Sequence, residues 1–168
     1  MQFFPPEHRT DGDLQLVAPA ARFVDDFLLA CAHPACRPDP ATHWTREQLL
    51  MFVHHHPNGT FGHRPGDRWP GYHFWMRLSP LSEPPVPFAG TVSLRLGDDD
   101  ELKRYWGHIG YGVFPPARGQ HYAERACRLI LPLAKKHGLE ELWITTNPDN
   151  IASRRTCERL VRGVGGNS

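Results

Sequence analysis

No long apolar run occurs in this sequence of 168 residues, although 40% of them are hydrophobic. A helix that crosses a bilayer needs about 20 consecutive apolar residues, and residues 1–9 contain no basic segment followed by an apolar core. These absences predict a cytoplasmic protein with no membrane partner. The length predicts one domain over residues 1–168, with a substantial hydrophobic core.

An excess of charge of either sign is also missing. Lysine and arginine together number 19, aspartate and glutamate 18, and the formal net charge is +1. A chain with so little net charge has no overall field that would attract nucleic acid. We therefore expect no nucleic-acid partner, and any anion must be bound by a local arrangement of groups.

Cysteine pairs with the spacing of metal or redox motifs are absent. The four cysteines, at positions 31, 36, 127 and 157, form no Cys-x-x-Cys pair, and two of them fall in helical patterns beside apolar neighbours. Buried free thiols in a reducing compartment are the expected state. A disulfide between Cys31 and Cys36 is the alternative that the sequence leaves open.

The eleven histidines do not form a metal-binding pattern either. His54, His55 and His56 are consecutive, so their side chains point in different directions on a helix, and His63 follows in a loop. No His-x-His or His-x-x-x-His pattern with a carboxylate partner accompanies them. We expect a solvated helix end and no metal, with a histidine-based metal-binding protein as the alternative.

Hydrophobic periodicity and turn residues predict a mixed α+β fold. Apolar residues recur at helical spacing after Pro19, and Thr45 with Gln48 forms a capping-box pattern that predicts a second helix. Short connections favour antiparallel strands, whereas the unit between Tyr105 and Thr146 predicts one parallel βαβ crossover. The expected order is a strand at 13–17, these two helices, a loop at 57–70, strands at 72–78, 88–96 and 105–114, a helix at 119–137, a strand at 140–146 and a helix at 151–160.

The stretch GYGVFPPARGQHYAERA, residues 110–126, has the pattern of a strand that ends at two prolines and is followed by a helix. A helix start presents backbone N–H groups that have no partner inside the helix, so it can hold an anion. Arg118 adds positive charge, and Gly119 lets a ligand approach the backbone. His121 is bulky at a point where glycine would suit a phosphate, and a plain turn before a helix is the alternative.

Residues 108–160 resemble the GCN5-related N-acetyltransferase (GNAT) superfamily, in particular its bacterial predicted acetyltransferases with a Gly-His-Ile-Gly-Tyr strand. The acetyl-CoA loop of that family has the pattern Arg/Gln-x-x-Gly-x-Gly/Ala, usually written Arg-Gly-Lys-Gly-Tyr-Ala. This sequence has Arg-Gly-Gln-His-Tyr-Ala at residues 118–123, so His121 stands where the family has its second glycine. The resemblance implies the GNAT fold, a mostly antiparallel twisted sheet flanked by helices, whose central strands splay apart.

The resemblance further implies an acyl-CoA-dependent N-acyltransferase, which moves an acetyl group from its co-substrate acetyl-CoA to a primary amine of a small molecule or protein. Backbone N–H groups of residues 118–123 would hold the CoA pyrophosphate, and the backbones of Val113 and Phe114 would hold the pantetheine arm. Asn150 would reach the same arm, and Ser153 matches a small residue of the family. The implied cofactor residues are Val113, Phe114, Arg118, Gly119, Gln120, His121, Tyr122, Ala123, Asn150 and Ser153.

Direct transfer from a thioester needs an unprotonated amine, a polarised carbonyl and a proton acceptor. His108 is the candidate base, because imidazole titrates near neutrality, with a strand histidine bonded to a neighbour as the alternative. Glu101 is a second candidate, with a solvated loop charge as its alternative. In many relatives a tyrosine seven residues after the asparagine protonates the departing thiolate. Cys157 stands at that position, either as a weak acid or as a buried, inert thiol.

Aromatic residues gather at 69–75, with Trp44 in the helical region before them. They predict either core packing or the wall of an acceptor pocket, since in the family the acceptor enters over the first two helices and the loop that follows. The family also carries a two-stranded hairpin after the last helix, which residues 161–168 are too short to form. Either the chain is truncated or another subunit supplies the missing strands; in the second case the exposed sheet edge near 140–146 would favour a homodimer. A non-catalytic acyl-CoA-binding or regulatory module is the alternative function, favoured by His121, Cys157 and the missing hairpin.

Overall fold

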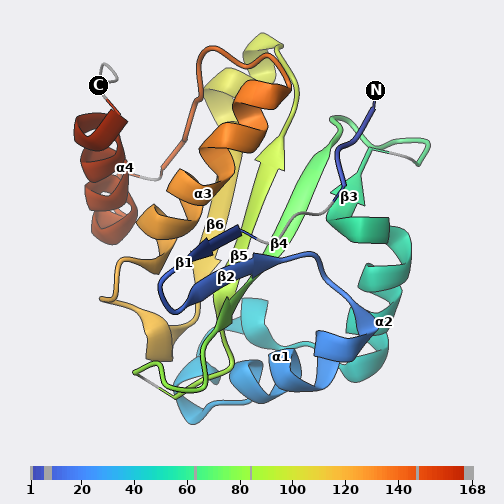
Figure 1. Ribbon diagram of the computed structural model, residues 1–168, viewed down its shortest axis with the longest axis vertical. Coiled ribbons are helices and arrows are strands. Elements are labelled where there is room, and N and C mark those ends of the chain that lie inside the picture. The colour runs from blue at the N-terminus through green and yellow to red at the C-terminus, as the bar shows by residue number, and fades with distance from the viewer. Residues whose placement is uncertain (1, 6–8, 63, 84, 147, 165–168) are drawn as a thin grey trace.

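A mixed sheet-and-helix fold is visible in the computed structural model, which describes residues 2–5, 9–62, 64–83, 85–146 and 148–164 (Figure 1). The described strands form a six-stranded antiparallel sheet in the order β1-β2-β4-β5-β6, with β3 beside β4. The strands are β1 (Arg9–Asp11), β2 (Leu14–Val17), β3 (Thr60–Phe61), β4 (Gly71–Leu78), β5 (Phe88–Arg95) and β6 (Ile109–Val113). The helices of at least two turns are α1 (Val24–Cys31), α2 (Arg46–His55), α3 (Tyr122–Lys136) and α4 (Ile151–Val164).

Each face of the sheet is covered by its own pair of helices. Successive side chains of a strand point to opposite faces, so Tyr72 and Phe74 of β4 pack in one core cluster with the buried side of α3. Trp75 of the same strand points to the other face, where it packs in a second cluster with Phe27 of α1 and Leu49 of α2. Because both faces are buried, the sheet fixes two separate packing surfaces.

The first two helices follow the sequence prediction closely. Helix α1 begins after a short 3-10 turn, Ala21–Phe23. At α2 the capping box is confirmed: the Gln48 N–H donates to Thr45 Oγ1 at 3.1 Å, and the Thr45 N–H donates to Gln48 Oε1 at 2.9 Å. The reciprocal bonds satisfy two donors at the helix start, which explains why α2 begins at Arg46.

The predicted strand 105–114 is wrong at its start. Residues Leu102–Trp106 form a π-helical turn instead. Asp99 Oδ1 accepts the N–H of Leu102 at 2.9 Å, and Gly107, with φ 73°, ends the turn in a conformation that suits glycine. Strand β6 therefore begins only at Ile109.

The predicted strand at 140–146 does not form a β ladder among the described residues, so the expected parallel crossover lacks its second strand. The segment meets β6 at its beginning, where the His108 N–H donates to the Trp143 carbonyl at 2.6 Å. No such bond follows farther along β6 within the described part of the chain. Among the described residues, one edge of β6 therefore has no strand beside it. Helix α3 begins at Tyr122 rather than at residue 119.

None of the described helices combines the length and apolar character that crossing a bilayer requires.

Asp13, just before β2, joins three separate parts of the chain. Its carboxylate accepts hydrogen bonds from Tyr122 Oη at 2.6 Å, Arg125 Nη2 at 2.7 Å and Ser82 Oγ at 2.8 Å. Burial works against the charged carboxylate, but these three bonds outweigh it and lower the pKa of Asp13 to about 2. Asp13 thus anchors the beginning of α3 to the sheet.

Replacing this anchor should destabilise the fold. We expect Asp13→Asn to lower the free energy of unfolding by about 2 kcal/mol, because charge-assisted bonds are lost while their buried donors remain. Since the pKa of Asp13 is lowered, its contribution is present above pH 3.8 and is lost as the pH falls towards 2. Urea unfolding from pH 7 to pH 2.5 measures both effects. The exposed Asp100→Asn is the matched control; equal losses in the two variants would contradict the role of Asp13.

Candidate functional site

The chain between β6 and α3 leaves a set of backbone N–H groups facing outward. After β6 a single 3-10 turn, Pro115–Ala117, leads to Gly119 with φ 84° and His121 with φ 61°. His121 is the N-cap of α3, and no side chain caps this helix start. The N–H groups of the first turn have no partner inside the helix, so the positive end of the helix dipole is open to a ligand.

The side chains of this loop have different tasks from its backbone. Arg118 is exposed, donates from Nε to the Val113 carbonyl at 3.1 Å and has Nη2 4.0 Å from Asp39 Oδ2. Gln120 is exposed, while Tyr122 and Ala123 are buried in the packing of α3. Tyr122 and Ala123 can therefore offer only their backbone groups to a ligand at the loop.

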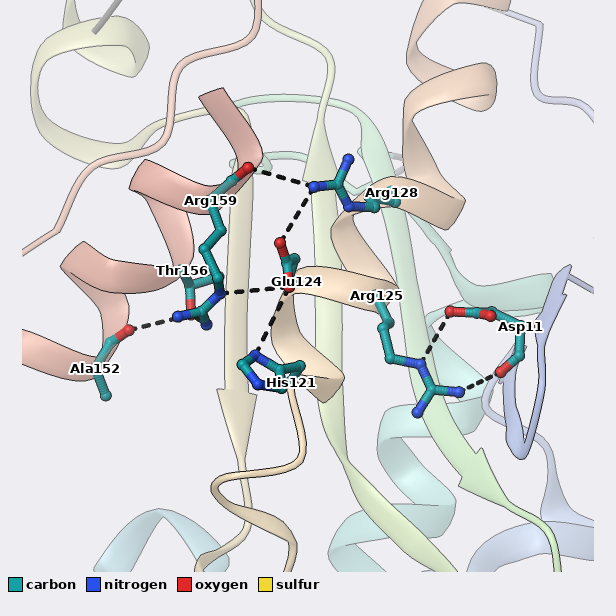
Figure 2. A network of polar contacts seen from close by, with 8 residues as sticks. All are labelled: Asp11, His121, Glu124, Arg125, Arg128, Ala152, Thr156 and Arg159. Carbon is teal, nitrogen blue, oxygen red and sulfur yellow. Dashed lines mark hydrogen bonds and ion pairs between the residues drawn. The ribbon is translucent and has the colours of Figure 1, made fainter. Parts of the chain in front are cut away.

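A charged network holds α4 against the first turn of α3 (Figure 2). The Glu124 carboxylate accepts hydrogen bonds from Arg128 Nη2 at 3.1 Å and Arg159 Nε at 3.3 Å. His121 Nδ1 lies 3.7 Å from Glu124 Oε2. On the opposite side of α3, Arg125 Nε donates to Asp11 Oδ2 at 2.9 Å. The uncapped helix start is thus held in position from both sides by side chains.

The open edge of β6 presents alternate backbone groups. The Phe114 N–H donates to the Ala89 carbonyl at 2.7 Å, so in an antiparallel ladder the amides of Gly112 and Gly110 also face β5. Those of Tyr111 and Val113 then face the open edge. Phe114 was expected to offer its backbone to pantetheine together with Val113; its N–H is already used in the ladder, and its carbonyl accepts the Ala117 N–H at 2.9 Å.

Tyr111 links β6 to α4. Its hydroxyl lies 2.7 Å from Ser153 Oγ and 4.0 Å from Cys157 Sγ. Asn150 Oδ1 accepts the Ser153 N–H at 3.1 Å and so caps the beginning of α4. Burial raises the pKa of Tyr111 to about 12 and also raises the pKa of Cys157. Both groups are therefore protonated at neutral pH.

Both ring nitrogens of His108 are bonded to backbone. Nε2 donates to the Gly97 carbonyl at 2.9 Å, and Nδ1 accepts the Trp143 N–H at 3.0 Å. The side chain is 1% exposed, and burial lowers its pKa despite the bond to Gly97. These contacts favour the alternative in which His108 is a structural residue: it joins the two chain segments that flank the start of β6.

Glu101, the second candidate base, pairs with Arg68 through both carboxylate oxygens at the surface. It does not line the cavity described next. The arrangement favours a solvated surface charge over a catalytic group.

A cavity of about 220 Å³ lies between the sheet and the first two helices. Its floor crosses three strands, with Trp75 of β4 paired to Thr91 of β5 and Thr91 paired to Gly112 of β6. The lining includes three residues for which the family resemblance implies contact with CoA: Val113, Phe114 and Arg118. The other lining residues are Phe27, Asp39, Ala41, Thr42, Trp44, Leu49, Phe52 and His73.

Of the two interpretations of the aromatic segment, core packing is confirmed for Trp75. Trp75 is 1% exposed and stacks on Phe27 with ring centroids 4.1 Å apart, as a core residue does. Trp75 and Trp44 nevertheless border the cavity beneath α2, where an acceptor wall was expected. One aromatic cluster therefore serves both the core and the cavity.

The consecutive histidines lie at the end of α2. The rings of His54 and His55 are 5.5 Å apart and tilted, and His56 Nδ1 donates to the Phe52 carbonyl at 2.7 Å. His63 is outside the described residues. Among the residues described, no three His, Cys, Asp or Glu side chains form a group that would hold a metal ion.

A family model for the acetyltransferase (GNAT) domain matches residues 13–160. The chain belongs to the GNAT acetyltransferase family. Its fold is shared by the microcin C7 self-immunity acetyltransferase MccE, solved with acetyl-CoA and AMP, at 15% identity and a TM-score of 0.61 over 89% of this chain and 78% of that one. It is shared equally by a Vibrio cholerae protein assigned as a ribosomal-protein-serine acetyltransferase, at 16% identity and a TM-score of 0.61 over 94% and 84% of the two chains. No curated protein sequence matches significantly.

In this GNAT domain two side chains stand out that sequence reasoning did not select. Tyr111 was part of the quoted strand motif, but its contact with Ser153 of α4 joins residues far apart in the sequence, which the motif does not reveal. His73 lay inside the aromatic segment, and only the register of β4 turns it towards the cavity. Alternation along 72–78 was the signal that could have placed His73 on the same face as Trp75.

The left-handed conformation of His121 gives a test of the loop. A β-branched residue is strongly disfavoured at φ 61°, so we expect His121→Val to lower the free energy of unfolding by about 1–2 kcal/mol. We expect His121→Gly to stay within about 0.5 kcal/mol of the parent, because glycine adopts this conformation freely. Urea unfolding of the three proteins measures the difference. If valine were tolerated as well as glycine, the φ of this residue would not constrain the loop.

Proposed function

We propose that this GNAT domain is an acetyl-CoA-dependent N-acetyltransferase that transfers the acetyl group directly to a primary amine. The observation that supports it best is that the edge of β6, the start of α3 and the cavity adjoin one another. The open edge of β6 leads into the uncapped start of α3, and the cavity opens beside the same residues, Val113 and Arg118. A donor laid along that edge would bring its acyl end to the cavity.

In this proposal the pyrophosphate of CoA binds the N–H groups at the beginning of α3, where the helix dipole favours negative charge. Arg118 adds its exposed guanidinium. The N–H groups of Tyr111 and Val113 hold the pantetheine arm in place of a neighbouring strand. Acetyl-CoA supplies an activated thioester, so the domain has mainly to position the amine and exclude water.

The proton steps need few side chains. His108 has no free ring nitrogen for a base, so the acceptor amine enters unprotonated, and the proton that its nitrogen loses as the C–N bond forms passes to solvent. Cys157 is a poor acid because burial raises its pKa, so the departing thiolate takes its proton from water. Catalysis then rests on orientation and on the backbone groups of β6.

Binding and transfer are tested separately. Calorimetry with acetyl-CoA should give a saturable signal, and mass spectrometry after incubation with an amine panel should find N-acetylated products. Tight binding with no product across a broad panel would favour the non-catalytic acyl-CoA-binding module. The absence of binding at high micromolar concentration would contradict both functions.

The charge of Arg118 gives a sharper test. We expect Arg118→Glu to raise the Kd for acetyl-CoA by about tenfold or more, because a charge-assisted contact to phosphate becomes repulsion. Arg104→Glu, an exposed change of the same size in the Leu102–Trp106 turn, is the control and should leave the Kd within about twofold. An unchanged Kd in Arg118→Glu would mean that the diphosphate does not bind near Arg118.

Cys157 is tested by removing its thiol. We expect Cys157→Ala to lower kcat by less than about tenfold, whereas loss of a general acid typically costs about 100-fold or more. Steady-state release of free CoA measures kcat, and thermal unfolding checks that the variant is folded. A fall of about 100-fold in a folded variant would make the thiol the proton donor after all.

A further inference from the structure

His73 is a polar side chain without a hydrogen bond in the described part of the chain, and it lines the cavity. It lies on the same face of β4 as Trp75, two residues away, opposite Ser93 of β5. No fully buried polar side-chain atom among the described residues lacks a partner. The ring nitrogens of His73 therefore reach solvent-accessible space, and the residue lines the cavity.

Most other polar side chains around the cavity are engaged in hydrogen bonds, and among the described residues the exception is Thr91 in the middle of the floor. Thr42 Oγ1 donates to backbone carbonyls at 2.9 and 2.8 Å. Asp39 Oδ1 accepts the Ala41 N–H at 3.0 Å, and its other oxygen faces Arg118. A ligand in the cavity would find His73 as a polar group with unused hydrogen-bonding capacity amid aromatic walls.

The surroundings keep the imidazole of His73 neutral. Burial, and after it the neighbouring side chains of His56 and Arg95, lower the pKa of His73 to about 4. Its ring packs edge-on against Phe52, with centroids 5.0 Å apart. A neutral imidazole offers one donor and one acceptor, and the same surroundings disfavour a second positive charge on a bound ligand.

Position decides which part of an acceptor His73 can touch. Neighbouring strands lie about 4.8 Å apart, so β4 and β6 are separated by roughly 10 Å across the floor. This inference rests on the proposed function, in which the reacting amine lies near β6 beside the thioester. His73 then meets the opposite end of the acceptor, beyond a stretch lined by Phe52 and Trp75.

We propose that the cavity takes a primary amine joined by a short chain to an aromatic ring that carries a hydrogen-bonding group, such as a phenol or indole, and that His73 binds this group. The cavity is smaller than sites for drug-sized ligands, about 300 Å³ and above, which suits a single ring with a short chain. Such an amine is a free small molecule or the amino-terminal residue of a peptide; the chemistry recognised is the same.

Tyramine and phenethylamine test this directly, since they differ by one hydroxyl. With the full chain and acetyl-CoA, we expect kcat/KM for tyramine to exceed that for phenethylamine by about tenfold, with KM carrying most of the difference. His73→Phe should bring the ratio near one while leaving phenethylamine within about threefold of the parent. His73→Leu is a second variant in case the larger ring disturbs folding, and His54→Gln, at an exposed position of α2, is the control with an unchanged ratio.

The outcomes separate this inference from the function it rests on. A ratio near one in the parent, a ratio that survives both His73 substitutions, or faster acetylation of spermidine would overturn the inference while leaving acetyl transfer intact. Binding of acetyl-CoA without acetylation of any of these amines would overturn it too. Absence of acetyl-CoA binding would instead contradict the proposed function. A peptide beginning with tyrosine, compared with tyramine, distinguishes the two sources of the acceptor.

Discussion

The antiparallel register of β4, β5 and β6 is the constraint on which the rest of the structure depends. It aligns Trp75, Thr91 and Gly112 in one row across the sheet and turns Tyr72 and Phe74 to the opposite face. A shift by one residue would exchange the faces. The aromatic floor of the cavity would then face α3, and the apolar side of α3 would lose its partners. Core and cavity are thus two consequences of a single pairing.

The beginning of α3 shows how a helix end can stay open to a ligand and still be fixed. Its first turn has no side-chain cap, which leaves donors unsatisfied in the protein alone. The stabilisation comes from the side chains that follow: Tyr122 and Arg125 bind Asp13, while Glu124 collects arginines from α3 and α4. Side chains thus fix the helix while its backbone end remains available.

Local signals in the sequence predicted much of the fold, and long-range effects limited the rest. The capping box at Thr45 and the break of the chain at Pro115 and Pro116 after β6 are encoded by neighbouring residues, so they were predicted correctly, whereas α3 begins at Tyr122 and not at residue 119. The π-helical turn before β6 depends on the Asp99 side chain and on the backbone conformation of Gly107, and the hydrophobic periodicity of the sequence carries no information about either. Residues 140–146 have strand composition, but pairing with β6 ends after Trp143. Cytoplasmic location, a homodimer and the roles of the individual CoA-loop residues stay predictions.

Gly112 shows how the cavity and the open edge are connected. A Cβ at this position would meet no atom within 4 Å, so packing within the protein does not require glycine there. At Gly107, by contrast, the Trp143 carbonyl would lie 2.8 Å from such an atom, so glycine is needed for the fold itself. The alternation of β6 directs position 112 onto the cavity floor, beside Thr91. A side chain there would extend into the space between the cavity and the strand edge. In the proposed reaction the acyl group meets the amine in this space, so on that proposal access, rather than close packing, accounts for the glycine.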